Sequence, residues 1–532
     1  MNSTASSISR PRQIRGLLLL AGLMGLVSTL SNWIVTGSSQ GLVMGGMVIA
    51  LVIIVVNTLN DWRTGFFLFI AWLLFEDLAR KFLGNGLIFF FGKDVLAAIT
   101  FASLLKAKAR GEVPWFRPPF AVPLALFFGL ALVQVFNTGS PSIVYGLLGL
   151  KLYFYYVPLM FVGYALIQTD RDLERCLVFN IALGLAIGIL GIIQSVVGLT
   201  FLNPAELAPE LRALGNLHRA SPITGLHMPS PTSVFASSGR FHWYMIVVAI
   251  LAVGTQAYLL LTRRRRAAWG FVGVGVTVVA AMQSASRGSI VYTIMSILVL
   301  SAGFLWGAPW KWGQGHRLVT AIRRVLLIGA AGLFLMVQLF PASIGATWAF
   351  YSETLSPTSS ATQLEFRALD YPIGNLQRVF QYDRWPYGFG TGTASLGLQY
   401  VSQLLGQPPP QIWVESGWGV MILEMGILGP FLWIAWAVTL LHYGWRIVRQ
   451  LRQTVYFPVG LSILWYAFLL LFPFTHMGMA PYQNYVMNAY FWFLIGILFR
   501  LPHLARLPQI VPSRSRASVP AMPGLAAFAR GR

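Results

Sequence analysis

The chain has 532 residues, of which 56% are hydrophobic and only 10% are charged. Apolar runs of about 20 residues recur along its length, which is typical of a polytopic membrane protein and excludes a soluble globular fold. The net charge of +22 is spread over short clusters, which does not favour nucleic-acid binding, and the single cysteine, Cys176, excludes a disulfide framework and a cysteine-cluster metal site.

The apolar runs predict an all-α integral membrane protein with about twelve to fourteen spanning helices. The first run follows MNSTASSISRPRQIR without a cleavage site and a polar mature domain after it, so we expect it to be retained as a span. The predicted spans are residues 16–36, 41–59, 62–77, 87–105, 119–137, 152–168, 177–197, 241–262, 267–285, 289–309, 324–342, 414–441, 456–475 and 482–500.

Basic clusters between the spans predict the orientation, because Lys and Arg accumulate in short cytoplasmic loops. If the N-terminal tail is cytoplasmic, the clusters in 106–117, 262–269, 311–324 and 445–452 all fall on that side. We therefore expect residues 1–500 to form the membrane domain, with both termini in the cytoplasm. The tail of 501–532, rich in Pro, Ser and Arg, is predicted to be disordered and to contact anionic lipid.

The turn SASRGS, residues 284–289, joins two spans and falls on the outer face in this topology. Arg287, with Ser286 beside it, is then an external cation at the mouth of the helix bundle. In a simpler alternative, Arg287 only reaches lipid headgroups, as arginines near span ends often do.

Two long loops, 198–240 and 343–413, also fall outside. Basic residues on the side that the charge rule disfavours predict an anionic ligand, because guanidinium groups match phosphate oxygens in pairs and lysine adds a point charge. The candidate ligand-binding cations are Lys93, Lys151, Arg212, Arg219, Arg240, Arg367, Arg378 and Arg384. In the alternative, such cations pair with acids, which are Asp77, Asp94, Glu206, Glu210, Glu353 and Asp383.

The large loop closes with PYGFGTGTASLGLQY, residues 386–400, followed by QIWVESGWGVMILEMGILGPFLW, residues 411–433. Its glycines predict a tight turn at the surface and only weakly suggest a phosphate-binding loop. Glu415 is expected in the first turn of the next span, where it could act as a general base, or merely cap the helix or pair with an arginine. Glu424 is expected to make a structural hydrogen bond inside the bundle.

The S-x-S-R-G turn, the large loop after it and the G-x-G…E-x-G…E-x-G-I-L-G re-entry resemble the O-antigen ligase and polymerase superfamily of bacterial inner-membrane proteins. The resemblance covers roughly residues 180–445. Segments 147–160 and 229–245 also resemble segments of the family that place basic residues, here Lys151 and Arg240, at the outer ends of helices.

The resemblance implies an all-helical glycosyltransferase with an architecture like the GT-C class. Its donor is expected to be an undecaprenyl-pyrophosphate-linked oligosaccharide and its acceptor a glycan, in O-antigen, capsule or exopolysaccharide synthesis. No metal and no cofactor are expected. Membrane lipids, a flippase and a chain-length regulator are the expected partners, and nucleic acid is not one.

One departure from the family distinguishes the alternatives. Ligases of this family are associated with a histidine at the re-entry, where this chain has Glu415, and this favours a polysaccharide polymerase over a ligase. Glu415 is predicted to accept the proton of the attacking hydroxyl, and Arg287, helped by Arg240 and Lys151, to stabilise the leaving pyrophosphate. A transporter or flippase of envelope glycolipids and a non-catalytic scaffold are the alternatives from other classes.

Overall fold

The computed structural model describes ten stretches of the chain and a few isolated positions between residues 320 and 345. The stretches are 52–83, 87–204, 218–220, 227–262, 267–284, 286–309, 348–352, 371–412, 414–472 and 480–506. Within them the fold is helical apart from one antiparallel hairpin, in which β1 (His218–Ala220) pairs with β2 (His227–Pro229). The predicted all-α class is confirmed for this part of the chain.

The helices follow the chain in three groups. The first group is α3 (Trp62–Leu83), α4 (Leu87–Ala109), α5 (Ala121–Val135), α6 (Ile143–Phe154), α7 (Leu159–Leu166) and α8 (Asp170–Val197). The second is α10 (Ser238–Thr262), α11 (Ala267–Gln283) and α12 (Arg287–Gly307). The third is α16 (Tyr371–Val379), α17 (Leu398–Leu405), α18 (Gly417–Met425), α19 (Leu428–Gln450), α20 (Phe457–Leu471), α21 (Ala480–Gln483) and α22 (Tyr485–Arg506).

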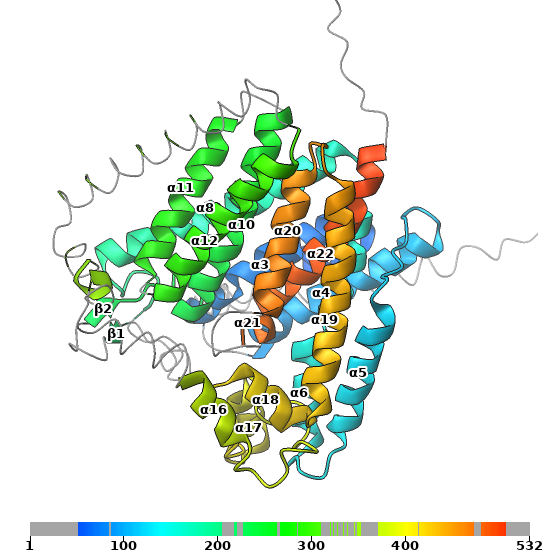
Figure 1. The fold of residues 1–532 in the computed structure, drawn as a ribbon. Coiled ribbons are helices and arrows are strands. Elements are labelled where there is room, and N and C mark those ends of the chain that lie inside the picture. The colour runs from blue at the N-terminus through cyan, green and yellow to red at the C-terminus, as the bar shows by residue number, and fades with distance from the viewer. Residues whose placement is uncertain are drawn as a thin grey trace, which may run out of the picture.

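Two helices form the centre of the bundle (Figure 1). α22 is apolar on all sides and every residue from 485 to 498 is buried, as expected of a helix surrounded by others. It packs against α7, α19 and α20, while α10 packs against α8, α11, α12 and α20. The short helices α16, α17 and α18 lie together at one end of the bundle.

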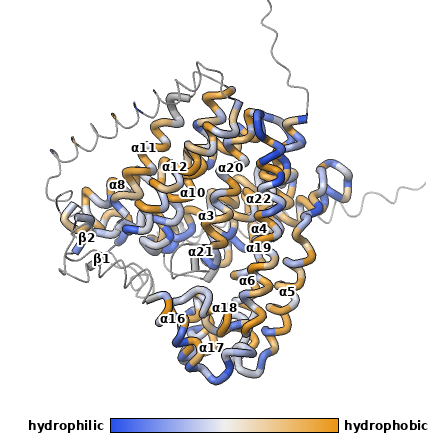
Figure 2. Tube along the Cα trace, viewed as in Figure 1, coloured by the Kyte–Doolittle hydropathy of each residue, from blue (hydrophilic) through white to orange (hydrophobic). Residues whose placement is uncertain are grey.

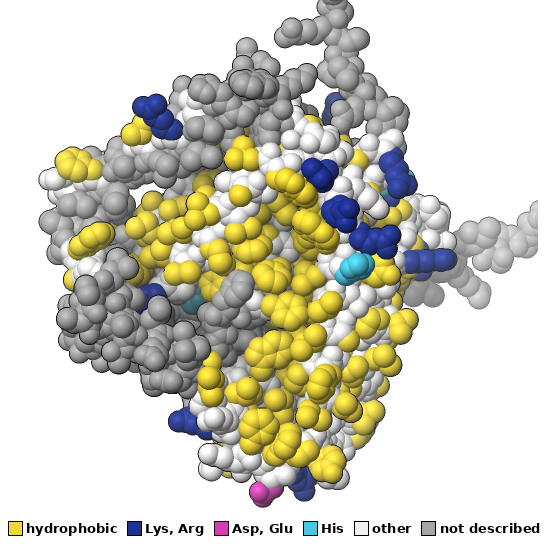
Figure 3. Space-filling model, in the orientation of Figure 1, with side chains coloured by type: hydrophobic (Ala, Val, Ile, Leu, Met, Phe, Trp, Pro, Cys, Tyr) yellow, Lys and Arg dark blue, Asp and Glu magenta, His cyan; other side chains and the backbone are white. Residues whose placement is uncertain are grey.

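Six described segments are long and apolar enough to cross a bilayer: Ile143–Leu166, Asp170–Val197, Ser238–Thr262, Arg287–Gly307, Leu428–Gln450 and Tyr485–Arg506. The helix bodies are apolar and the hydrophilic residues gather near their ends (Figure 2). Apolar side chains also cover the visible outer face over α19 and α20, and Phe431, for example, is 64% exposed (Figure 3). Such a surface suits lipid rather than water.

Two predicted spans differ from the helices observed. The predicted span 414–441 is divided into α18 and α19. Gly426, directly after α18, has a positive φ of 69°, which ends the helix. Pro430 lies in the first turn of α19, where its missing amide is tolerated, and it could not lie within one continuous helix without breaking a hydrogen bond. The predicted span 152–168 begins earlier, at α6, whose N-terminus is capped by Ser142, and it is interrupted before α7, where Pro158 is the N-cap residue.

The end of α19, the end of α12 and the start of α8 lie together. The amide of Gln453, after α19, donates to the carbonyl of Gly307 at the end of α12 at 2.9 Å. The guanidinium of Arg452 lies 4.0 Å from the centre of the Trp306 ring. The hydroxyl of Tyr456 donates to Asp170 at the start of α8. The segment 386–400 lies at the other end of α19, because Ile427 donates to the carbonyl of Pro386.

Some sequence predictions concern residues that lie wholly or partly outside the described stretches. The predicted spans 16–36 and 324–342 lie outside them, apart from isolated positions in the second, and so does most of 41–59. The predicted tail of 501–532 begins too early, because α22 continues to Arg506; the rest of the tail lies outside the described residues.

Candidate active site

A cavity of about 620 Å³ lies where several helices begin, at the end of the bundle away from the basic loops. The first turns of α10, α18 and α22 border it, together with the middle of α6 and the segment 394–400. The cavity brings together four of the residues that the sequence singled out: Lys93, Lys151, Arg240 and Glu415. His242 and Gln483 also lie on its wall.

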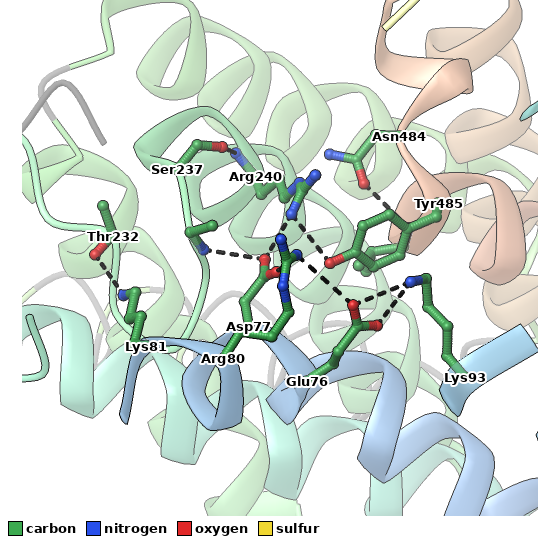
Figure 4. A network of polar contacts seen from close by, with 12 residues as sticks. Glu76, Asp77, Arg80, Lys81, Lys93, Thr232, Ser237, Arg240, Asn484 and Tyr485 are labelled. Atoms are coloured by element: carbon green, nitrogen blue, oxygen red, sulfur yellow. Dashed lines mark hydrogen bonds and ion pairs between the residues drawn. The ribbon is translucent and has the colours of Figure 1, made fainter. Parts of the chain in front are cut away.

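Arg240 reaches the cavity from the first turn of α10 and is held by a buried acid. Its Nη1 lies 2.6 Å from Asp77 Oδ2 and donates to the hydroxyl of Tyr485 at 3.1 Å (Figure 4). Asp77 also accepts hydrogen bonds from Arg80 at 3.0 Å and from the backbone amide of Ala236 at 3.0 Å. The carboxylate therefore fixes both the arginine side chain and the backbone that leads into α10.

A second acid of α3 holds a second cation of the cavity. Glu76 lies 2.9 Å from the Nζ of Lys93, which is 4.6 Å from the centre of the Tyr485 ring. Lys81, one turn further along α3, donates to Thr232 Oγ1 and to the carbonyl of Ser233, both at 2.9 Å. The side chains of Glu76, Lys81 and Lys93 are all buried.

Lys151 projects from α6 and forms the third cationic group. Its Nζ lies 2.5 Å from Asp94 Oδ2, and the hydroxyl of Tyr156 donates to Asp94 Oδ1 at 3.0 Å. The alternative in which the outer cations pair with acids therefore describes the contacts of Arg240 and Lys151 in this structure, with Asp77 and Asp94 as their partners. Pairing does not make the cluster neutral.

The charges around the cavity are unequal. Five cations, Arg80, Lys81, Lys93, Lys151 and Arg240, face four carboxylates, Glu76, Asp77, Asp94 and Glu415. Burying a surplus of one positive charge is costly unless a counter-charge is available. The cluster is therefore suited to bind an anion.

Glu415 also lines the cavity and is partly exposed. The prediction that it lies in the first turn of a helix is wrong, because α18 begins at Gly417 and Ser416 is its N-cap residue, accepting from the amide of Gly419 at 3.1 Å. Glu415 thus does not cap α18, and it shares the lining of the cavity with His242.

The remaining predicted residues do not line the cavity. Ser286 caps α12 by accepting from the amide of Ser289 at 3.3 Å. The guanidinium of Arg287 lies 4.7 Å from the centre of the Phe350 ring. Arg378 is exposed in the last turn of α16, and Arg384 borders a separate hollow with Asp383, Gln381 and Gln411.

The glycine-rich turn is buried rather than at the surface. Gly388, Gly390 and Gly392 all have positive φ, and a β-carbon on Gly392 would lie 2.0 Å from the carbonyl oxygen of Tyr145. The turn therefore packs directly on α6 and continues into the cavity wall. Glu424 accepts hydrogen bonds inside the bundle, as expected.

Sequence reasoning named Asp77 of α3 as a possible partner of the cations but missed Glu76, Arg80 and Lys81. These charges lie at the end of a predicted span or directly after it, which is the signal that they are buried rather than part of a solvated helix end. His242 was missed because it lies singly within an apolar run. Among the described residues, no group of three or more His, Cys, Asp or Glu could hold a metal ion.

Comparison with known proteins finds no family model that matches the chain and no curated protein similar to it.

Proposed function

We propose that the protein is a membrane glycosyltransferase that polymerises a polysaccharide from polyprenyl-pyrophosphate-linked sugar units at the outer face of the inner membrane. The observation that carries this proposal is the cavity that Lys93, Lys151, Arg240 and Glu415 line together. Such a cavity offers cations for a pyrophosphate and a carboxylate for a sugar hydroxyl.

The helix termini support anion binding. Gly239 and Arg240 of α10, Gly417 of α18 and Tyr485 of α22 border the cavity, and all belong to first turns. The positive ends of these helix dipoles therefore add to the field of the side-chain cations. A pyrophosphate bound there would relieve the surplus positive charge and be stabilised as it leaves the sugar.

The reaction follows from this arrangement. The acceptor hydroxyl attacks the anomeric carbon, its proton passes to Glu415, and the bond between that carbon and the pyrophosphate oxygen breaks. The electron pair stays on the pyrophosphate, which remains attached to its lipid and is held by Lys93, Lys151 and Arg240. A single displacement inverts the anomeric centre.

The apolar part of the wall suits the remainder of the donor. Leu148, Leu152, Trp243 and Val420 border the cavity beside the charged groups. Aromatic rings stack on sugars, and aliphatic side chains can contact the polyprenyl chain next to the pyrophosphate. Arg287 has no part in this scheme because it does not line the cavity, and Lys93 supplies a cation in its place.

The test uses lipid-linked repeat units extracted from host cells that lack this chain. Purified protein in proteoliposomes should convert them to polymer, and Arg240→Ala should abolish the conversion. Deletion should leave single lipid-linked units in the outer leaflet. Units retained in the inner leaflet would show a flippase, and complete polymer left on its carrier would show a ligase.

A further inference from the structure

Behind the cavity wall, the buried carboxylate of Glu424 is held by three neutral donors. Its Oε1 accepts from the backbone amide of Ala394 at 3.1 Å and from the hydroxyl of Ser395 at 2.5 Å, and its Oε2 accepts from the hydroxyl of Tyr153 at 3.0 Å. Within the described residues, no Lys, Arg or His forms an ion pair with it. The donors that hold Glu424 include a residue of the cavity wall.

Gln483 closes this arrangement into a ring. Its Nε2 donates to the hydroxyl of Tyr153 at 2.9 Å and to Ser395 Oγ at 3.2 Å, and its Oε1 accepts from the backbone amide of Leu396 at 3.3 Å. α6, α18, α21 and the segment 394–396 are therefore joined through side chains whose orientations are mutually fixed.

Ser395 borders the cavity and keeps hydrogen-bonding capacity that the ring does not use. A hydroxyl has one proton and two lone pairs. The proton of Ser395 goes to Glu424 and one lone pair accepts from Gln483, which leaves one lone pair on a side chain that borders the cavity. Because the proton is held by a carboxylate, Ser395 can serve a ligand only as an acceptor, and it is a stronger one for that contact.

The rest of the polar wall shows why an acceptor matters there. Lys93, Lys151 and Arg240 have only donors to offer. Each hydroxyl of a sugar has one proton to donate, and those cations cannot accept it. The attacking hydroxyl gives its proton to the base, so a second hydroxyl of the same sugar needs another acceptor. Ser395 and Glu415 are acceptors on the same wall.

We propose that Ser395 accepts a hydrogen bond from a hydroxyl of the acceptor sugar other than the attacking one, and that Glu424 is the positioning residue that turns the Ser395 lone pair toward the cavity. This inference rests on the proposed function, since it assigns the acceptor side of the same site. The hydrogen-bonded ring fixes this orientation of the Ser395 hydroxyl before the acceptor binds, so no reorganisation is needed on binding.

The experiment measures polymerisation of the extracted lipid-linked units in proteoliposomes, together with binding of a short polyprenyl pyrophosphate that carries no sugar. Ser395→Ala should raise the KM for the lipid-linked units about tenfold, because one hydrogen bond to the sugar is lost. Binding of the sugar-free pyrophosphate should stay unchanged. Glu424→Gln should raise the KM similarly, and the double variant should be no worse than the worse single variant.

Thr393→Ala is the matched control, because its hydroxyl donates to the carbonyl of Gly390 in the same segment without bordering the cavity. A KM for Ser395→Ala equal to that of Thr393→Ala would overturn the inference, as would additive effects in the double variant. If Glu424→Gln does not fold, the KM values of Ser395→Ala and Ser395→Cys, compared with that of Thr393→Ala, still test the inference. Wild-type protein that polymerises nothing would instead overturn the proposed function.

Discussion

Arg240 at the start of α10 and Asp77 on α3 form an ion pair of 2.6 Å across 163 residues of sequence. The pair joins two parts of the bundle at the wall of the cavity, and the Asp77 side chain is completely buried. Because Asp77 also holds Arg80 and the amide of Ala236, one carboxylate fixes two cations and the backbone that leads into α10. Asp77 therefore stabilises the fold and also positions a cation of the cavity wall.

Asp77→Asn should destabilise the protein strongly. The amide keeps the size of the side chain but leaves Arg240 without its buried counter-charge and Arg80 with Glu76 alone, and breaking a buried pair costs about 3–5 kcal/mol. The free energy of unfolding in detergent measures the effect. Glu112→Gln provides the comparison, because its pair with Arg110 is about half exposed and should contribute less than about 1 kcal/mol. Equal losses for the two variants would contradict the assigned role of Asp77.

Arg240→Lys should rescue activity poorly. The guanidinium contacts both Asp77 and the hydroxyl of Tyr485, and its planar fork can also bind two phosphate oxygens, which an ammonium group cannot do. We expect polymerisation to fall about 100-fold, in keeping with the loss of a strong transition-state contact. Arg378→Lys, a change at an exposed position of α16, should leave the rate unchanged. Full activity of Arg240→Lys would show that only its charge matters.

Arg287→Ala should leave polymerisation largely intact, although the sequence resemblance predicts its loss. The guanidinium of Arg287 stacks on Phe350 and lies outside the cavity wall, so its removal should cost stability of about 0.5–2 kcal/mol rather than chemistry. The rate per folded molecule is the measurement to make. Abolished turnover by a stable Arg287→Ala variant would return this residue to the active site.

The orientation in the membrane can be tested with two single cysteines at opposite ends of α5. Thr138 follows this helix and Glu112 precedes it, and both are exposed, whereas Ser284 is buried and unsuitable for labelling. In a Cys176→Ser background, Thr138→Cys should react with an impermeant thiol reagent in intact cells. Glu112→Cys should react only after the inner membrane is permeabilised, because the basic cluster around it is expected to be cytoplasmic. The reverse pattern would invert the topology.

Much of the helical fold could be predicted from hydropathy alone. Long apolar runs located α8, α10, α12 and α22 to within a few residues, since a bilayer demands about 20 such residues per helix. The break between α18 and α19 was not predicted, because Gly426 and Pro430 lie inside a run whose average hydropathy stays high. Backbone interruptions of this kind depend on a neighbouring segment, here Pro386, to accept the freed amide of Ile427.

The site was predicted less completely, for a physical reason. Lys151, Arg240 and Glu415 were found because charged residues next to apolar runs are conspicuous, and all three line the cavity. Whether Arg287 joins them depends on how helices rotate and tilt, which hydropathy does not specify. The ring around Glu424 joins residues up to 330 positions apart, so only the tertiary fold shows it.

The last prediction decides between the two titratable side chains that share the cavity wall with the cations. Glu415 and His242 both border the cavity, and either could accept the proton of the acceptor hydroxyl. We expect Glu415 to be the base. Its carboxylate is an anion and still attracts the hydroxyl proton when pyrophosphate and its cations are bound nearby. Glu415→Gln keeps the size of the side chain but loses its proton affinity, so turnover should fall about 10²–10⁴-fold.

His242→Gln is the matched variant, since it removes the imidazole from the same wall, and we expect a loss below about tenfold, that of a single hydrogen bond. Both variants should be measured on the lipid-linked units in proteoliposomes, normalised to folded protein. Glu415→Asp, shorter by one methylene group, should retain partial activity. If Glu415→Gln is nearly normal and His242→Gln is not, the base is the histidine on α10, and the carboxylate only balances charge at the cavity wall.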